Sequence, residues 1–181
     1  ETNLGTIEIT LHPEVAPAHV ENFLNYVNDG DYSNSFFHRS VPGFIIQAGG
    51  FAYSNQQFSY VPADPAVPNE FNLSNVRGTV AMAKLGDDPD SATNQWFINL
   101  ADNAANLDNQ NGGFTVFGTV TRGMAIADVI AGLQIFDPNG PEYQSVFDNL
   151  PIRNFSSLSN PVVWDNHLVL INQATERVNV P

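Results

Sequence analysis

The chain has 181 residues, a hydrophobic fraction of 43% and no cysteine. It is long enough for one globular domain with a real core, while disulfides, thiolate metal sites and cysteine nucleophiles are excluded. The formal net charge of −13 argues against nucleic acid as a partner, because such a surface repels phosphate backbones. No apolar run approaches the roughly 18 residues that a membrane-spanning helix needs.

The first elements are a strand and a helix. Residues 4–11 alternate between apolar and polar side chains at the period of a half-buried strand. After Pro17 the apolar side chains recur at helical spacing, at Val20, Phe23, Leu24 and Val27. Pro17 suits the first position of a helix, and Gly30 suits the left-handed residue that ends one.

Five shorter stretches with strand character follow, separated by turns rich in Gly, Pro, Asn and Asp: 35–39, 43–48, 79–84, 95–100 and 114–120. A second amphipathic helix is predicted over 123–132, and a last strand over 167–174. Residues 134–166 are expected to form a long loop insert, and loops of this length are uncommon unless functional or locally ordered. Many short strands with two helices favour a mainly β domain whose antiparallel sheet is closed or sandwiched.

Several chemistries lack their motifs. There is no Gly-x-Ser-x-Gly elbow for a serine nucleophile. The four histidines, His12, His19, His38 and His167, have no metal-ligand spacing, so each is expected to be structural. The acidic residues of the Asp87–Asp90 loop do not fit a calcium loop and suggest a solvated turn. The sequence therefore implies no metal and no cofactor.

The segment Phe36–Gln47 is unusual because it places Arg39, one of only six Lys and Arg residues, among apolar residues. Strand alternation puts Ile45 and Gln47 on one face and Phe44 on the other, unless a bend intervenes. Arg39 is either paired with an acid or directed into a groove. The residues alone leave both interpretations open and slightly favour the ion pair.

Several motifs of this chain resemble those of the cyclophilins, in the same order and spacing. They cover roughly residues 4–133 and comprise Phe-His-Arg, Pro-Gly-Phe and Gln-x-Gly within 37–49, Asn-Glu-Phe at 69–71, Gly-Thr-Val-Ala-Met-Ala at 78–83, Asn-Gln-Trp-Phe-Ile at 94–98 and Phe-Thr-Val-Phe-Gly at 114–118. The resemblance implies an eight-stranded closed antiparallel barrel capped by two helices. It also implies peptidyl-prolyl cis-trans isomerase activity, with a single domain spanning 1–181.

The resemblance further implies the site residues. Arg39 matches the family's catalytic arginine, and Phe44 and Gln47 are the other two residues expected to be catalytic. The substrate groove is expected to include Ile45, Met82, Ala83, Gln95, Phe97, Leu107 and Phe114. Asn106 departs from the family pattern, since cyclosporin-sensitive members carry Trp there and bacterial ones often carry Phe, which puts drug sensitivity in doubt.

The residue types suit the reaction. Rotation about an X-Pro bond passes through a twisted state over a barrier of about 20 kcal/mol, and no bond is made or broken. In the twisted state the prolyl nitrogen regains its lone pair and accepts a hydrogen bond. A permanently charged donor such as Arg39 therefore stabilises the transition state more than either ground state.

The expected partners are proline-containing peptides and unfolded proteins, bound by a monomer that requires no membrane. A periplasmic or secreted location is favoured by the acidic, Asn-rich, Cys-free composition, with the cytoplasm as the alternative. Two other functions remain open: a binding module with this fold whose catalysis is incidental, and an unrelated β-barrel that binds small ligands.

Overall fold

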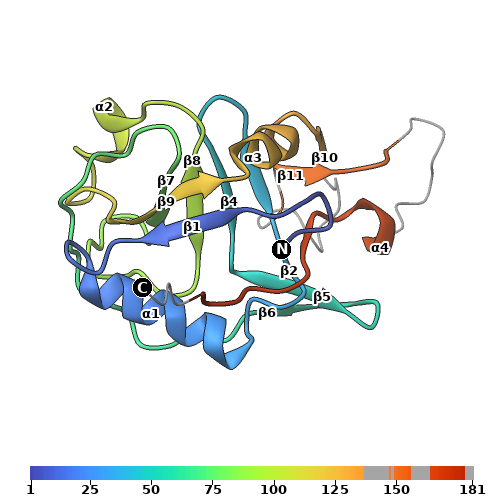
Figure 1. Ribbon diagram of the computed structural model, residues 1–181, viewed down its shortest axis with the longest axis horizontal. Helices are drawn as coiled ribbons and strands as arrows, with labels where there is room; N and C mark the ends of the chain where they lie inside the picture. Colours follow the sequence, from blue (N-terminus) through green and yellow to red (C-terminus); the bar gives the residue numbers. More distant parts are fainter. Residues whose placement is uncertain (137–146, 148, 156–163, 178–181) are drawn as a thin grey trace.

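The computed structural model describes residues 1–136, 147, 149–155 and 164–177, and Figure 1 shows the arrangement of their elements. The strands of these residues form three antiparallel sheets. The largest has the order β1-β9-β7-β8-β4-β3 and comprises Glu8–Leu11, Val116–Arg122, Thr79–Met82, Trp96–Asn99, Ile45–Ala48 and Arg39–Val41. The second has the order β12-β2-β5-β6 and comprises Leu170–Ile171, Ser35–Phe36, Phe51–Ser54 and Gln57–Tyr60.

The central strands of the large sheet are buried on both faces. All four residues of β7 and of β8 are buried. Successive side chains point to opposite faces of a strand, so Met82 and Ile98 enter the main core while Ala81 and Phe97 enter a smaller cluster on the other side. This two-sided burial explains why these strands read as continuous apolar runs rather than as alternating ones.

Two helices of more than one turn pack against the main core, α1, Pro17–Asp29, at the bottom of the view in Figure 1 and α3, Met124–Ala131, at the top. Both were predicted, and both are confirmed. Gly30 ends α1 in the left-handed conformation, with φ of 80°, and its N–H donates to the carbonyls of Tyr26 and Val27. No helix in the described part of the chain is both long enough and apolar enough to cross a membrane.

The N-terminus of α1 is capped by a distant residue. Glu70 accepts hydrogen bonds from the backbone N–H groups of Ala18 at 3.1 Å and His19 at 3.0 Å. The same carboxylate contacts His19 Nδ1 at 2.8 Å. A carboxylate at this end accepts hydrogen bonds from otherwise unpaired N–H groups, and its negative charge interacts favourably with the positive end of the helix dipole. The Asn-Glu-Phe motif thus anchors the first helix.

The strand pairing does not close the predicted eight-stranded barrel. Among the described residues, β3 and β1 are the edges of an open six-stranded sheet, and a separate four-stranded sheet lies beside it. The chain leaves one sheet for the other between β2 and β3, where Phe37 N–H donates to Val169 and His38 N–H donates to Gln47. On the outer edge of β3, the N–H of Ser40 donates to the carbonyl of Asn149, which belongs to no strand.

The region expected to be a loop insert contains regular structure. Strands β10, Gln134–Phe136, and β11, Leu150–Ile152, form a two-stranded sheet, and α4 spans Trp164–His167. This region packs on the four-stranded sheet through Phe147, which contacts Phe51 with ring centroids 5.2 Å apart. The rest of the predicted insert, 137–146, 148 and 156–163, lies outside the described residues. The predicted strand 167–174 is shortened to Leu170–Ile171 because α4 runs to His167.

Candidate active site

A row of side chains crosses one face of the large sheet. Arg39 is opposite Gln47, Gln47 is opposite Phe97, Phe97 is opposite Ala81, and Ala81 is opposite Val116. Residues paired across neighbouring strands share a face and approach closely. The row therefore joins a polar end, on β3 and β4, to an apolar end, on β8, β7 and β9.

At the polar end three side chains are joined by hydrogen bonds, an arrangement called the relay below. Arg39 Nη1 donates to Gln47 Oε1 at 3.4 Å, and Gln47 Nε2 donates to Gln95 Oε1 at 2.8 Å. Gln95 is supported by Gly50, where an added β-carbon would lie 2.8 Å from the Gln95 Cδ atom. The predicted residues Arg39, Gln47 and Gln95 thus meet, and Gly50 gives Gln95 the room to do so.

Arg39 differs from the other five Lys and Arg residues of the chain, all of which are described. Arg77, Arg122 and Arg177 each pair with a carboxylate. Lys84 and Arg153 donate to backbone carbonyls. Within the described residues Arg39 has neither kind of partner and contacts only an amide. The geometry therefore favours the groove-directed cation over the structural ion pair.

His38 precedes Arg39 and is 4% exposed. Its ring packs edge-on against Phe51, with centroids 4.9 Å apart. Burial, together with the smaller effect of the positive charge of Arg39, lowers the pKa of His38 from 6.5 to about 4. The imidazole is therefore neutral at pH 7 and adds no charge beside the guanidinium.

The apolar end is a pocket cluster of side chains from four strands, from helix α2, Ala104–Leu107, and from four loops. Its buried members are Ile45, Ala81, Phe97, Leu107 and Val116, and its partly buried members are Phe44, Leu73, Ala83 and Phe114. Phe97 and Phe114 meet nearly edge to face, with centroids 5.8 Å apart and an interplanar angle of 71°. Six predicted site residues, Phe44 and five groove residues, are brought together here, while Leu73, Ala81 and Val116 were missed.

Strand alternation accounts for Ala81 and Met82, and a turn accounts for Phe44. Ala81 lies two residues before Ala83, and that spacing could have indicated it. Met82, predicted to line the groove, is fully buried in the main core on the opposite face. Phe44 joins Ile45 rather than facing away from it, because it lies in the turn before β4 and not in the strand.

The loop that carries Phe114 is held by Lys84. Its Nζ donates to the carbonyls of Asn111 at 2.6 Å and Gly113 at 2.7 Å, and lies 4.9 Å from the centroid of the Phe114 ring. Burial lowers the pKa of Lys84. Asn106 is exposed beside the buried Leu107, in α2, Ala104–Leu107. It therefore lies at the rim of the pocket cluster.

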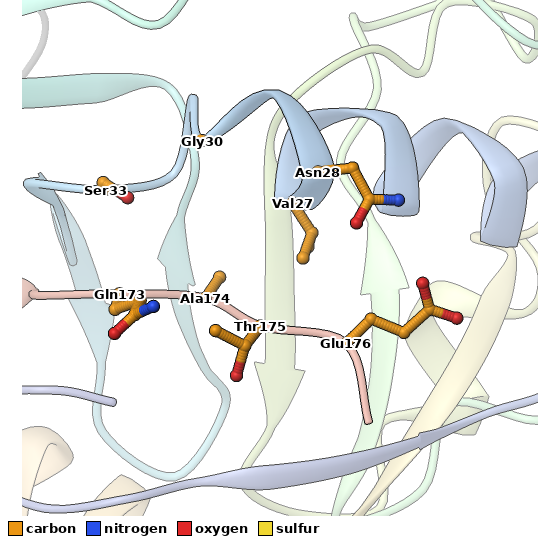
Figure 2. A pocket seen from close by; sticks show the side chains of 8 residues that line it. All are labelled: Val27, Asn28, Gly30, Ser33, Gln173, Ala174, Thr175 and Glu176. Carbon is orange, nitrogen blue, oxygen red and sulfur yellow. The ribbon is translucent and has the colours of Figure 1, made fainter. Parts of the chain in front are cut away.

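A separate shallow hollow lies between the end of α1 and the C-terminal segment (Figure 2). It is lined by Val27, Asn28, Gly30, Ser33, Gln173, Ala174, Thr175 and Glu176. The lining offers one carboxylate and no cation, so it lacks the convergent charged donors of the Arg39 row. In the part of the chain that the structure describes, no three His, Asp or Glu side chains converge as metal ligands.

Comparison with known proteins identifies the family. Residues 1–152 match the family model described as cyclophilin type peptidyl-prolyl cis-trans isomerase/CLD. Peptidyl-prolyl cis-trans isomerase A of Dickeya dadantii is 44% identical over 149 residues, which cover 80% of this chain and 75% of that protein. Peptidyl-prolyl cis-trans isomerase B of Escherichia coli is 41% identical over 138 residues, which cover 73% of this chain and 82% of that protein.

The fold agrees with this match. A Cryptosporidium parvum cyclophilin type peptidyl-prolyl cis-trans isomerase, solved in the presence of the dipeptide Ala-Pro, aligns with a TM-score of 0.64 at 19% identity, over 93% of this chain and 91% of that one. The chain belongs to the cyclophilin-type peptidyl-prolyl cis-trans isomerases, as the motifs predicted. It is a peptidyl-prolyl cis-trans isomerase, EC 5.2.1.8.

Proposed function

We propose that Arg39 is the electrostatic catalyst of this isomerase. The observation that carries the proposal is that Arg39 has no acidic partner among the described residues and lies in the same row as the apolar pocket cluster. A guanidinium has five N–H donors in a fixed plane. Among the described residues the Arg39 guanidinium hydrogen-bonds only to Gln47. Its other N–H groups can therefore donate to the prolyl nitrogen when that atom regains its lone pair.

The pocket cluster holds the proline ring in this proposal. Phe97 and Phe114 form an aromatic corner, and Leu107 and Ile45 close the sides. The ring stays fixed while the preceding carbonyl swings, so the guanidinium meets the nitrogen in the twisted state. Gln47, whose Nε2 is held by Gln95, offers its amide to the substrate backbone.

The substrates are proline-containing peptides and unfolded proteins, and the enzyme assists folding by accelerating X-Pro isomerisation, one of the slow steps of folding. The relative from Cryptosporidium parvum, studied with Ala-Pro, supports a short dipeptide unit as the recognised element. We propose that the chain acts as a monomer, as one domain over 1–181, without cofactor, nucleic acid or membrane. A periplasmic or secreted location is proposed from composition alone.

The test is a cis-trans exchange assay on a short Ala-Pro peptide in the cold, where the uncatalysed reaction takes minutes. The intact protein accelerates the exchange, and Phe97→Ala weakens that acceleration by removing the aromatic corner. A protein that binds the peptide without accelerating the exchange would instead be a binding module with this fold.

A further inference from the structure

Three asparagines are buried together behind the pocket cluster. Asn75 and Asn99 are 0% exposed, and Asn103 is 7% exposed. An amide removed from water without hydrogen bonds costs about 1–3 kcal/mol by protein mutational data. Such groups persist in a core when their bonds are satisfied and specify one arrangement. Their partners therefore indicate what these three residues do.

Asn99 is the centre of the chain of bonds. Its Nδ2 donates to Asn75 Oδ1 at 3.1 Å and to Thr79 Oγ1 at 2.9 Å, and its Oδ1 accepts from Asn103 Nδ2 at 2.8 Å. Asn99 is opposite Ile45 in the large sheet and two residues beyond Phe97 on β8. It therefore projects from the same face of the sheet as Phe97 and lies next to the pocket cluster.

The two outer asparagines, Asn103 and Asn75, donate hydrogen bonds to the backbone of the pocket walls. Asn103 Nδ2 donates to the carbonyl of Phe44 at 2.9 Å, and Asn75 Nδ2 donates to the carbonyl of Phe114 at 2.9 Å. The backbone of Asn103 accepts from Leu107 N–H at 2.8 Å, and Leu107 in turn accepts from Phe114 N–H at 3.0 Å. Three walls that come from separate loops are thereby tied to one buried centre.

Local structure does not account for these amides. Asn103 is the residue before α2, a position where Asn is favoured because its side chain caps the helix. Its side chain makes no such cap and points inward instead. Asn75 also donates from its backbone and side chain to Asp108 Oδ1, at 2.9 and 3.0 Å. Burial opposes the charge of Asp108, but these bonds outweigh it and lower its pKa.

We propose that Asn75, Asn99 and Asn103 are positioning residues that fix the spacing of the pocket walls and so set which ring the pocket accepts. This rests on the proposed role of the pocket cluster as the proline site. An apolar pocket discriminates one methylene by about 10–200-fold when its walls are rigid. The asparagine chain supplies that rigidity, since apolar contacts alone do not fix the distance between loops.

The test compares two peptides that differ only in the ring: Ala-Pro and its six-membered homologue, Ala-pipecolic acid. Asn75→Ala removes three side-chain hydrogen bonds and Asn103→Ala removes two, in each case including the bond to one wall. Each loss is expected to lower kcat/KM for Ala-Pro about tenfold. The ratio of kcat/KM for the two peptides falls as well, because a loosened pocket loses more on the smaller ring. Asn103→Ser, which keeps a hydroxyl, serves if Asn103→Ala does not fold.

The matched control is Asn3→Ala. Asn3 also ties two backbone segments, the N-terminal one and that of 168–170, by donating to Leu168 O at 2.9 Å and accepting from Leu170 N–H at 3.2 Å, and none of these residues belongs to the pocket cluster. Asn3→Ala loses stability and keeps both kcat/KM values at a temperature where it is folded. A general loss of stability would therefore move the control as much as the test variants.

Phe97→Ala separates the two levels of the proposal. If Phe97→Ala changes the Pro to pipecolate ratio while folded Asn75→Ala and Asn103 variants keep the wild-type ratio, the positioning role is overturned and the pocket stands. If Phe97→Ala also leaves the ratio unchanged, the pocket assignment itself fails.

Discussion

Arg39→Ala isolates the contribution of the guanidinium to catalysis. The side chain lies on β3, is partly buried, and makes one recorded hydrogen bond within the described residues, at 3.4 Å to Gln47. A bond of that length is weak, so the free energy of unfolding falls by about 1 kcal/mol or less. The native sheet and the pocket cluster remain, and the loss of activity reports on the transition state.

The expected loss of kcat/KM is about 100–1,000-fold. A preorganised donor aimed at charge that develops in the transition state contributes roughly 2.7–4 kcal/mol, and each 1.36 kcal/mol is tenfold in rate. Arg39→Lys keeps a positive charge but loses the planar fork of donors. It is expected to fall between Arg39→Ala and the wild-type enzyme.

The assay is cis-trans exchange on an Ala-Pro peptide in the cold, with the fold of each variant checked by circular dichroism. The control is Arg122→Ala, which removes an exposed pair with Glu8 at 3.2 Å and should leave activity unchanged. Turnover of folded Arg39→Ala within a few-fold of wild type would refute the electrostatic role.

Three further predictions concern Gly50, His38 and Asn106. Gly50→Ala places a β-carbon 2.8 Å from the Gln95 side chain and should lower kcat/KM about tenfold by breaking the relay; Gly86→Ala, with nothing within 4 Å, should not, and equal effects would contradict the relay. The pKa of His38 is about 4 when folded and 6.5 when unfolded, so the unfolded chain binds this proton first, and stability present above pH 6.5 is lost as the pH falls towards 4. The full loss is about 3 kcal/mol, of which about 2 kcal/mol falls between pH 7 and 4.5. Urea unfolding at these two pH values should detect it; equal values would exclude a buried neutral imidazole. Asn106→Trp should tighten cyclosporin binding by adding apolar area at the rim, measured by calorimetry, and unchanged affinity would remove this residue from the rim contacts.

The long elements were predictable because their signals are local. Helix α1 begins at a proline, repeats apolar residues at helical spacing and ends at a left-handed glycine, all within its own residues. The two-residue strand β12 and the single turn α4 have too few residues for a period. They form because the packed tertiary structure supplies their partners, and no local pattern announces them.

The closed barrel was expected from family resemblance, and the strand pairing of the described residues gives separate sheets instead. Sequence periodicity specifies which face of a strand is apolar, but it does not specify the strand's neighbours. β3 pairs with β4 on one edge, and on its other edge it meets the backbone of Asn149, a residue more than a hundred positions away. Such a contact depends on how distant segments pack.

The sequence by itself determined the family, the scarcity of cations and the singular position of Arg39 among apolar residues. It left open whether that arginine pairs with an acid, because an ion pair can join residues at any separation along the chain. Tertiary structure decided this by placing Gln47, and no carboxylate among the described residues, beside the guanidinium. It also revealed the buried Asn75–Asn99–Asn103 chain, since amides that read as turn residues in sequence acquire a shared role only when folding removes them from water.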